Sequence, residues 1–384
     1  MNLKFLDFFS RFRSSNKDKE TLNQSSSKNG QNLLPSLAYV QITEPLPLKI
    51  HRKKNREKTI QKFASILSSK TVICLDKLRD IAWVGIPLNY KSRCWRLLLD
   101  YEPTNIEQTE TVLHHKRADY FNCKTRLFNQ QSLWTSVERL TLNQISVDIP
   151  RTPILILHDQ RVSKLFTSVL FIWAVRHPAS GYVQGMNDVL LPFFICFILP
   201  FYPTVSLNSF YQLDNIDLID DESLNSIEAD CFWCFSRLMD GIQDVYTRDQ
   251  PGIHRMIKNL DKVVSSTSPD LSNWIKKEHI NYINFTIRWF NCLVVREFKL
   301  QQLFRIWDLF VSDSSKIPSK LVYVCAAMMK LLTPMLINLP KAEFIETIQT
   351  IHQDFWTDER VEMILAQSFV FEKNIDIEEI VVRG

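Results

Sequence analysis

Residues 160–176, with the sequence QRVSKLFTSVLFIWAVR, are the stretch that decides the fold class. Apolar side chains recur in it at spacings of three and four residues, which places them on one face of an α-helix. They are Val162, Leu165, Phe166, Val169, Leu170 and Trp173. A helix over 160–176 would be about 25 Å long. His177 and Pro178 follow, and a residue before proline disfavours the helical conformation, so this predicted helix stops near 176.

The same helical periodicity recurs in two later segments of the chain. Residues 232–242 and 253–264 each carry apolar side chains at helical spacing, and no run alternates with the period of two that strands require. The chain has only 7 glycines against 25 phenylalanines, which favours long helices over a turn-rich β architecture. Residues 202–228 interrupt the pattern with several acids and are predicted to form a surface loop. We therefore expect an all-α domain over 71–370.

The two ends of the chain differ from this body. Residues 1–70 hold 14 Lys and Arg against five Asp and Glu, a net charge of +9 in a chain whose total is +4. Such a polar segment buries too little apolar surface to offset the entropy of ordering, so we expect it to be largely disordered. Its first 12 residues mix apolar and basic side chains, which suits an anionic membrane surface, a frayed tail or a segment packed on the body. Residues 371–384 are predicted to be a short tail.

Composition excludes several classes of protein. The body from residue 71 is acidic overall, whereas a nucleic-acid-binding domain should be basic. The longest apolar run, 189–201, is shorter than the roughly 20 residues that cross a bilayer. Eight scattered cysteines without a secretory signal favour free thiols in the cytoplasm, and Cys231 and Cys234 lie in a helical apolar pattern that favours core packing over zinc. No P-loop, GxSxG or HExxH motif is present, so no self-contained active site is recognised.

Two segments carry polar residues that a core pattern does not need. The first is 145–153, in which Pro150 and Pro153 flank Arg151 and lack the backbone N–H that a helix uses, so Arg151 is predicted to lie on a stiff, non-helical segment. The second is 180–188, in which two glycines bracket Gln184 and allow sharp bends. The nine residue steps before the 160–176 helix span roughly 30 Å when extended, enough to return Arg151 to the end of that helix near Gln184.

These segments resemble the paired signature of the TBC-domain Rab GTPase-activating proteins. The resemblance rests on Ile145, Asp148 and Arg151 at spacings of three, together with Tyr182-x-Gln184. Further motifs agree in order and spacing over about residues 75–366. They are Trp83 to Pro87 with Arg93 and Trp95, Glu228 to Phe235, Gln250 to Ile253, Arg288-Trp289, Arg296-Glu297 and Trp307-Asp308. The run from Arg176 to Gln184 is similar to the subfamily of the yeast Golgi-type activators and their animal relatives.

The resemblance implies a two-lobed helical TBC fold and a GTP-bound Rab-family GTPase as partner. Arg151 would enter the nucleotide site of that GTPase and stabilise charge on the transferring phosphoryl group, while Gln184 would position the attacking water. The chain would need no cofactor of its own, because GTP and magnesium would be bound by the partner. The subfamily implies a cytoplasmic protein of vesicle trafficking, peripheral at the Golgi or other endomembranes.

Four neighbouring residues have supporting roles in this interpretation. Asp148 would orient Arg151, Tyr182 belongs to the signature of Gln184, and Asn187 and Asp188 would brace the Gln184 loop through backbone hydrogen bonds, although turn or helix-cap roles explain them equally well. The apolar stretch 153–157 departs from the family pattern, in which a polar or aromatic stretch is usual. Two other functions remain open: a non-catalytic Rab-binding scaffold with the same fold, and a helical adaptor that touches no GTPase.

Overall fold

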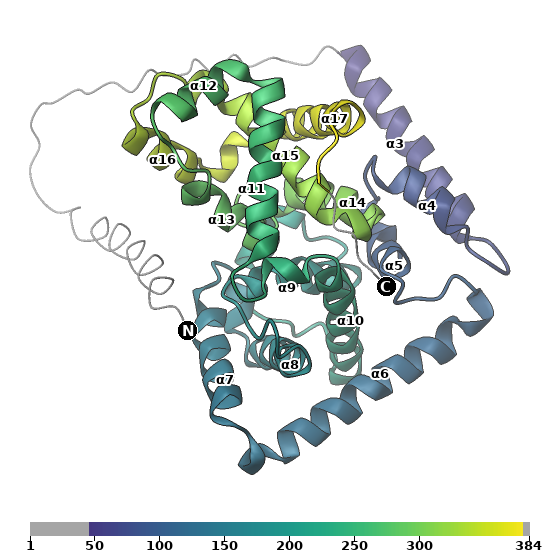
Figure 1. Ribbon diagram of the computed structural model, residues 1–384. Helices are drawn as coiled ribbons and strands as arrows, with labels where there is room; N and C mark the ends of the chain where they lie inside the picture. Colours follow the sequence, from purple (N-terminus) through teal and green to yellow (C-terminus); the bar gives the residue numbers. More distant parts are fainter. Residues whose placement is uncertain (1–45, 379–384) are drawn as a thin grey trace, which may run out of the picture. The chain divides into compact units, whose positions relative to one another are not determined.

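The computed structural model describes residues 46–378, with side chains from residue 57, and the chain from Lys54 onward forms one compact unit. These residues fold into α-helices joined by turns and short 3-10 helices (Figure 1). The only β-type pairing within 46–378 is a single bridge between Val72 and Asn105. The prediction of an all-helical fold is therefore confirmed for the described part of the chain.

The helices divide into an earlier and a later set along the chain. The earlier helices are α3 (Leu46–Leu67), α4 (Leu75–Ala82), α5 (Leu88–Leu98), α6 (Ile106–Asn129), α7 (Ser136–Asp148), α8 (Gln160–Arg176), α9 (Met186–Ile198) and α10 (Asp221–Asp240). The later helices are α11 (Pro251–Thr267), α12 (Pro269–Lys277), α13 (Ile283–Asn291), α14 (Leu300–Ser312), α15 (Ile317–Leu336), α16 (Lys341–Gln349) and α17 (Asp358–Asn374).

The helices pack as two groups. In the first group α8 packs against α7 and α10, and α9 packs against α10; in the second group α15 packs against α11 and α17. Helix α5 joins the groups, because it contacts α9 and α10 as well as α14. Its fully buried Trp95 meets Phe193 of α9 edge-on and stacks with Trp307 of α14. One continuous apolar core therefore supports both groups.

The bounds of α8 and α10 follow from their end residues. The Asp159 carboxylate accepts the Arg161 N–H at the start of α8, and the helix ends at Arg176, as predicted. The loop predicted over 202–228 is wrong in its last part, because α10 already begins at Asp221. Asp220 caps that helix and Asp221 lies in its first turn, where negative charge is stabilised by the helix dipole. These acids therefore begin a helix rather than prolong a loop.

The N-terminal body boundary lies earlier than the sequence predicts. Helix α3 occupies 46–67, within the segment expected to be disordered up to residue 70. Its Phe63 and Leu67 are buried in the core, and the Phe63 ring stacks near that of Tyr90. Ile66 packs against the same core, so tertiary packing of a few apolar side chains stabilises a helix whose overall composition is polar. The possible membrane segment over the first 12 residues lies outside the described residues.

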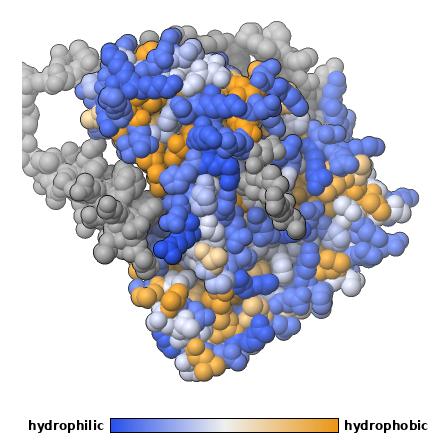
Figure 2. Space-filling model, in the orientation of Figure 1, coloured by the Kyte–Doolittle hydropathy of each residue, from blue (hydrophilic) through white to orange (hydrophobic). Residues whose placement is uncertain are grey.

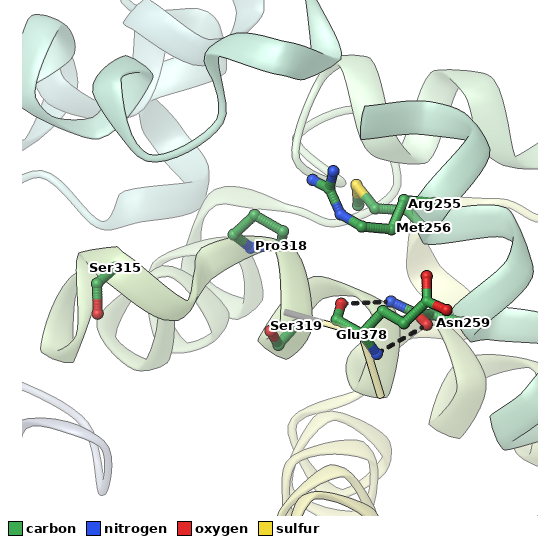
Figure 3. Close-up of a pocket in the computed structure, with 7 residues that line it drawn as sticks. All are labelled: Arg255, Met256, Asn259, Ser315, Pro318, Ser319 and Glu378. Atoms are coloured by element: carbon green, nitrogen blue, oxygen red, sulfur yellow. Dashed lines mark hydrogen bonds between the residues drawn. The ribbon is translucent and has the colours of Figure 1, made fainter. Parts of the chain in front are cut away.

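The C-terminal tail also begins later than the predicted residue 371. Helix α17 extends to Asn374, and its Phe371 is buried. Beyond it, the Asn259 side chain of α11 donates to the Glu378 carbonyl at 2.9 Å and accepts the Glu378 N–H at 3.2 Å (Figure 3). The cavity beside this contact has a volume of only about 20 Å³, room for about one water molecule. Residues 371–378 are thus part of the folded body.

One described segment, Ser314–Leu336, is long and apolar enough to cross a membrane by length and composition. In the structure 67% of its most apolar window is buried inside the protein. Helix α15, which makes up most of this segment, packs against α11 and α17. Its apolar character is accounted for by its place in the core of the second group of helices.

Candidate functional site

The first candidate residue, Arg151, lies just beyond the C-terminal end of helix α7. The helix starts with a capping box in which Thr135 and Glu138 satisfy each other's backbone N–H groups. At its other end it continues directly into a 3-10 turn, Ile149–Arg151. The predicted non-helical conformation of Arg151 is therefore wrong. Pro150 occupies an early position of the 3-10 turn, where its missing N–H is not needed.

The Arg151 side chain is partly anchored and partly free. It is 46% exposed, and its Nη1 donates to a carboxylate oxygen of Asp148 at 3.3 Å. Asp148 itself is only 5% exposed. Burial raises the pKa of Asp148, while the nearby Arg151 charge and a hydrogen bond from Tyr182 act in the opposite direction. Asp148 thus orients one edge of a guanidinium whose remainder faces solvent.

Gln184 lies in the loop between α8 and α9. Gly185, which follows it, has a φ of +107°, a conformation that side chains rarely adopt. A Cβ on Gly185 would lie 2.9 Å from the sulfur of Cys292, so the backbone of this loop fits tightly against α13 and its end. Gln184 is half-buried, and its carboxamide has no hydrogen bond to any residue in the described range 46–378. The loop backbone is fixed while the carboxamide keeps its hydrogen-bonding groups available.

Two side-chain contacts join the Arg151 segment to the Gln184 segment. The buried Tyr182 hydroxyl lies 3.3 Å from an Asp148 carboxylate oxygen and 3.2 Å from the Asn187 Oδ1, so these two acceptors share its proton. The Asn187 Nδ2 donates to the Thr152 hydroxyl at 2.7 Å. Asn187 also accepts the Gly185 N–H at 3.3 Å. The chain therefore returns along α8 and holds the two segments side by side, which the sequence permits but does not require.

Asp188 has a different partner from the one expected. It does not brace the loop by a backbone contact of its side chain but pairs with Arg296, whose Nε and Nη2 lie 2.8 and 2.7 Å from one carboxylate oxygen. Burial lowers the pKa of Arg296 and the Asp188 charge raises it, with a net upward shift. This ion pair attaches the first turn of α9 to the segment before α14.

Sequence reasoning missed two residues of this arrangement. Thr152 is buried, and its hydroxyl accepts a hydrogen bond from Asn187, although nothing in the sequence around Arg151 indicates this partner. No local pattern indicates the partner of Arg296, because Asp188 lies 108 positions away in the chain. The only available signal was the Arg296-Glu297 dipeptide of the family resemblance.

The candidate site is an open surface rather than a cavity. The cleft of about 310 Å³ beside Trp233, Arg176 and Lys116 contains neither Arg151 nor Gln184, and neither does the small cavity of Figure 3. Cys231 and Cys234, the CxxC pair, are fully buried in the core, as predicted, and burial raises the pKa of both thiols. A partly exposed guanidinium and a carboxamide without a hydrogen-bond partner in residues 46–378, on two segments joined by side-chain contacts, suit a site that a second molecule completes.

The chain is similar to known proteins over much of its length. Residues 89–337 match the family model described as the Rab-GTPase-TBC domain. The chain is 36% identical to human TBC1 domain family member 22B over 82% of its own length and 61% of that protein. It is 39% identical to the GTPase-activating protein GYP1 of Saccharomyces cerevisiae over 67% of its own length and 40% of that protein.

A solved structure supports the same assignment at the level of the fold. The crystal structure of the Ypt/Rab-GAP domain of Gyp1p superimposes with a TM-score of 0.75 at 36% identity, covering 82% of this chain and 98% of that one. The chain spans less than two thirds of the length of the human and yeast relatives it matches. The family match, the sequence identity and the shared fold together show that the chain belongs to the Rab-GTPase-TBC domain family.

Proposed function

We propose that this chain is a GTPase-activating protein for a Rab-family small GTPase. The observation that carries the proposal is the pair of contacts, Tyr182 to Asp148 and Asn187 to Thr152, that joins the segment of the partly exposed Arg151 to the segment of the half-buried Gln184. The names of the yeast relative and of the matched family point to the same activity. The nucleotide and its magnesium ion would belong to the GTPase.

In this mechanism Arg151 inserts its guanidinium beside the γ-phosphate of GTP. The group is planar, permanently charged and matched to phosphate oxygens, so it stabilises the charge that builds up on them during transfer. Such an arginine supplied in trans accelerates hydrolysis by about 10³–10⁵-fold. Asp148 holds one edge of the guanidinium at 3.3 Å and limits the side-chain entropy lost on insertion.

Gln184 would act on the attacking water. Its carboxamide oxygen accepts a hydrogen bond from that water while its NH₂ group donates to a phosphate oxygen. The absence of a competing partner for this side chain among residues 46–378 and the tight backbone at Gly185 both favour this role. No covalent intermediate is needed, because positioning and electrostatic stabilisation supply the acceleration.

The test is single-turnover GTP hydrolysis by a panel of purified Rab proteins, each measured with and without this chain. At least one Rab should hydrolyse GTP on the order of 10³-fold faster with the chain present. A scaffold would bind GTP-loaded Rab and leave every hydrolysis rate unchanged. An adaptor of other proteins would show no GTP-dependent Rab binding in a pull-down.

Location is a separate part of the proposal. The resemblance to the Golgi-type subfamily favours a cytoplasmic protein that is peripheral at Golgi membranes. The first 13 residues, in which apolar side chains are mixed with Lys4, Arg11 and Arg13, would add affinity for anionic lipid. Co-sedimentation with anionic liposomes should weaken when residues 1–45 are deleted, a truncation that keeps α3 and its buried Phe63. Unchanged co-sedimentation would show that this N-terminal segment does not bind the membrane.

A further inference from the structure

Helix α7 has an exposed apolar face that ends at Arg151. Val137, Leu140 and Val147 are 69%, 60% and 41% exposed, and they lie three and seven positions apart. Arg151 follows Val147 by four positions. Because the Ile149 N–H donates to the Ile145 carbonyl, the helical path continues into the 3-10 turn. At about 100° per residue, the three apolar side chains and Arg151 share one face.

The buried face of α7 has its own partners and does not need these residues. Ile145 is fully buried and Asp148 contacts Tyr182, so this side faces the body, where α7 packs against α8. In Figure 2 hydrophobic residues mark the lower left edge of the molecule, where α7 lies in Figure 1. Single exposed apolar side chains are ordinary, but a row of them beside a functional residue is typical of an interaction surface.

We propose that the α7 stripe, defined as Val137, Leu140 and Val147, is a docking surface for the same small GTPase that receives Arg151. This inference rests on the proposed function and names the surface that would determine affinity for the partner. The stripe would bury apolar side chains of α7 against an apolar patch beside the nucleotide site of the GTPase.

The distances along α7, compared with the size of a stable protein interface, favour a GTPase as the partner of the stripe. Val147 lies about 6 Å along the helix from Arg151, Leu140 about 16 Å and Val137 about 21 Å. A stable protein interface buries about 800 Å² on each partner, which corresponds to a contact about 30 Å across. A GTPase seated over Arg151 must therefore cover Val147, and an interface that extends along α7 reaches the whole stripe.

The charges near the stripe argue against a lipid surface. A membrane-binding helix carries several Lys or Arg beside its apolar face. Helix α7 has one, Arg139, and its guanidinium already donates to the backbone carbonyls of Trp134 and Gln131. Glu138 and Asp148 give the helix a negative net charge. An apolar protein surface is the better match.

The experiment compares two variants on the Rab that the wild-type chain accelerates most. The double variant Val137→Asp/Leu140→Asp places charges on the stripe far from Arg151, and Val370→Asp places one on an exposed position of α17 as a matched control. Stimulated hydrolysis is measured over a range of GTP-loaded Rab concentrations to separate KM from kcat. Thermal unfolding of each variant shows whether it remains folded.

The double variant should raise KM about tenfold or more while kcat at saturating Rab stays near the wild-type value. Val370→Asp should change neither constant. A double variant with wild-type KM would overturn the docking surface and leave the proposed function intact. A wild-type chain that accelerates no Rab would overturn both. A chain that sediments as a dimer only when the stripe is intact would assign the surface to a second copy instead.

Discussion

The Arg151 guanidinium contacts a protein side chain on one side only, so substitutions of Arg151 can test its charge and its shape separately. Its Nη1 contacts the buried Asp148, while 46% of the side chain remains exposed. In the proposed mechanism the free part of the guanidinium binds phosphate oxygens through several parallel N–H groups. Charge and shape are therefore separable contributions at this residue.

Replacing Arg151 with lysine tests that separation. Arg151→Lys keeps the positive charge but loses the planar fork, and we expect it to lower stimulated hydrolysis by about 100-fold or more, nearly as far as Arg151→Ala. Single-turnover rates on the accelerated Rab measure the effect. Both variants should stay folded, because nearly half of the Arg151 side chain is exposed and its one ion pair, with Asp148, is long at 3.3 Å. Activity close to wild type in Arg151→Lys would contradict the proposed role.

The loop between α8 and α9 shows how a backbone conformation fixes the second candidate residue. Gly185 is the N-cap residue of α9 and has a φ of +107°. A Cβ added to its Cα would lie 2.9 Å from the Cys292 sulfur. Gly181, in the same loop, also has a positive φ of +61°, but a Cβ there would meet nothing within 4 Å. The two glycines therefore differ in crowding, which makes them a matched pair.

Alanine at these two positions should separate strain from crowding. Gly185→Ala combines an unfavourable φ with a 2.9 Å contact, so we expect a loss of about 2–3 kcal/mol in the free energy of unfolding and a displaced Gln184. Gly181→Ala should cost only about 1 kcal/mol, the penalty of a left-handed residue. Urea denaturation measures both values. Equal losses would show that contact with Cys292 does not constrain the loop.

Lys320, in the first turn of α15, is buried and predicts a pH dependence. Its Nζ donates to the Leu309 carbonyl and the Ser312 hydroxyl at the end of α14. Burial lowers its pKa to about 8, whereas the ordinary value of lysine is 10.5. Between these values the unfolded chain binds more protons than the folded chain, so rising pH favours folding.

Lys320→Met removes this titration and gives the reference. The free energy of unfolding of the wild type, relative to Lys320→Met, should rise between about pH 8 and pH 10.5 by up to about 1.4 kcal/mol per pH unit and be flat below pH 8. Subtracting the free energy of unfolding of Lys320→Met cancels the contributions of the tyrosines and cysteines that titrate in the same pH range. A difference that does not change with pH would show that Lys320 keeps its ordinary pKa in the folded state.

The helical elements and their periodic faces could be predicted from the sequence, but contacts between distant residues could not. The bounds of α8 follow from its apolar spacing and from Pro178. Helix α3 was missed because its composition is polar, and among its residues from 57 onward few, chiefly Phe63 and Leu67, reach the core. The pairing of Arg296 with Asp188 has no local pattern, since it depends on how the two groups of helices pack.

The same limit applies to the ionic cluster that joins the two groups of helices. Asp308 of α14 is buried and accepts from the Ile86 N–H at 2.7 Å, the Lys91 ammonium at 2.6 Å and the Trp95 indole N–H at 2.9 Å. Lys91 is also buried, which composition alone does not predict for a lysine. One carboxylate thus connects α14 to the start and middle of α5, 213 to 222 positions earlier in the chain.

Removing this carboxylate should loosen the molecule as a whole. Asp308→Ala leaves a buried ammonium and two buried N–H groups without an acceptor, so we expect a loss of about 3–5 kcal/mol in the free energy of unfolding, measured by chemical denaturation. Lys91→Met/Asp308→Leu replaces both charges with apolar side chains and should recover a large part of that loss, because the desolvated ion disappears. The Rab-stimulated kcat of the folded fraction should stay near the wild-type value, since none of the hydrogen bonds of Asp308 involves Arg151 or Gln184. If Asp308→Ala unfolds within about 1 kcal/mol of the wild type, then apolar packing around Trp95 and Trp307, rather than the ion pair, holds the two groups of helices together.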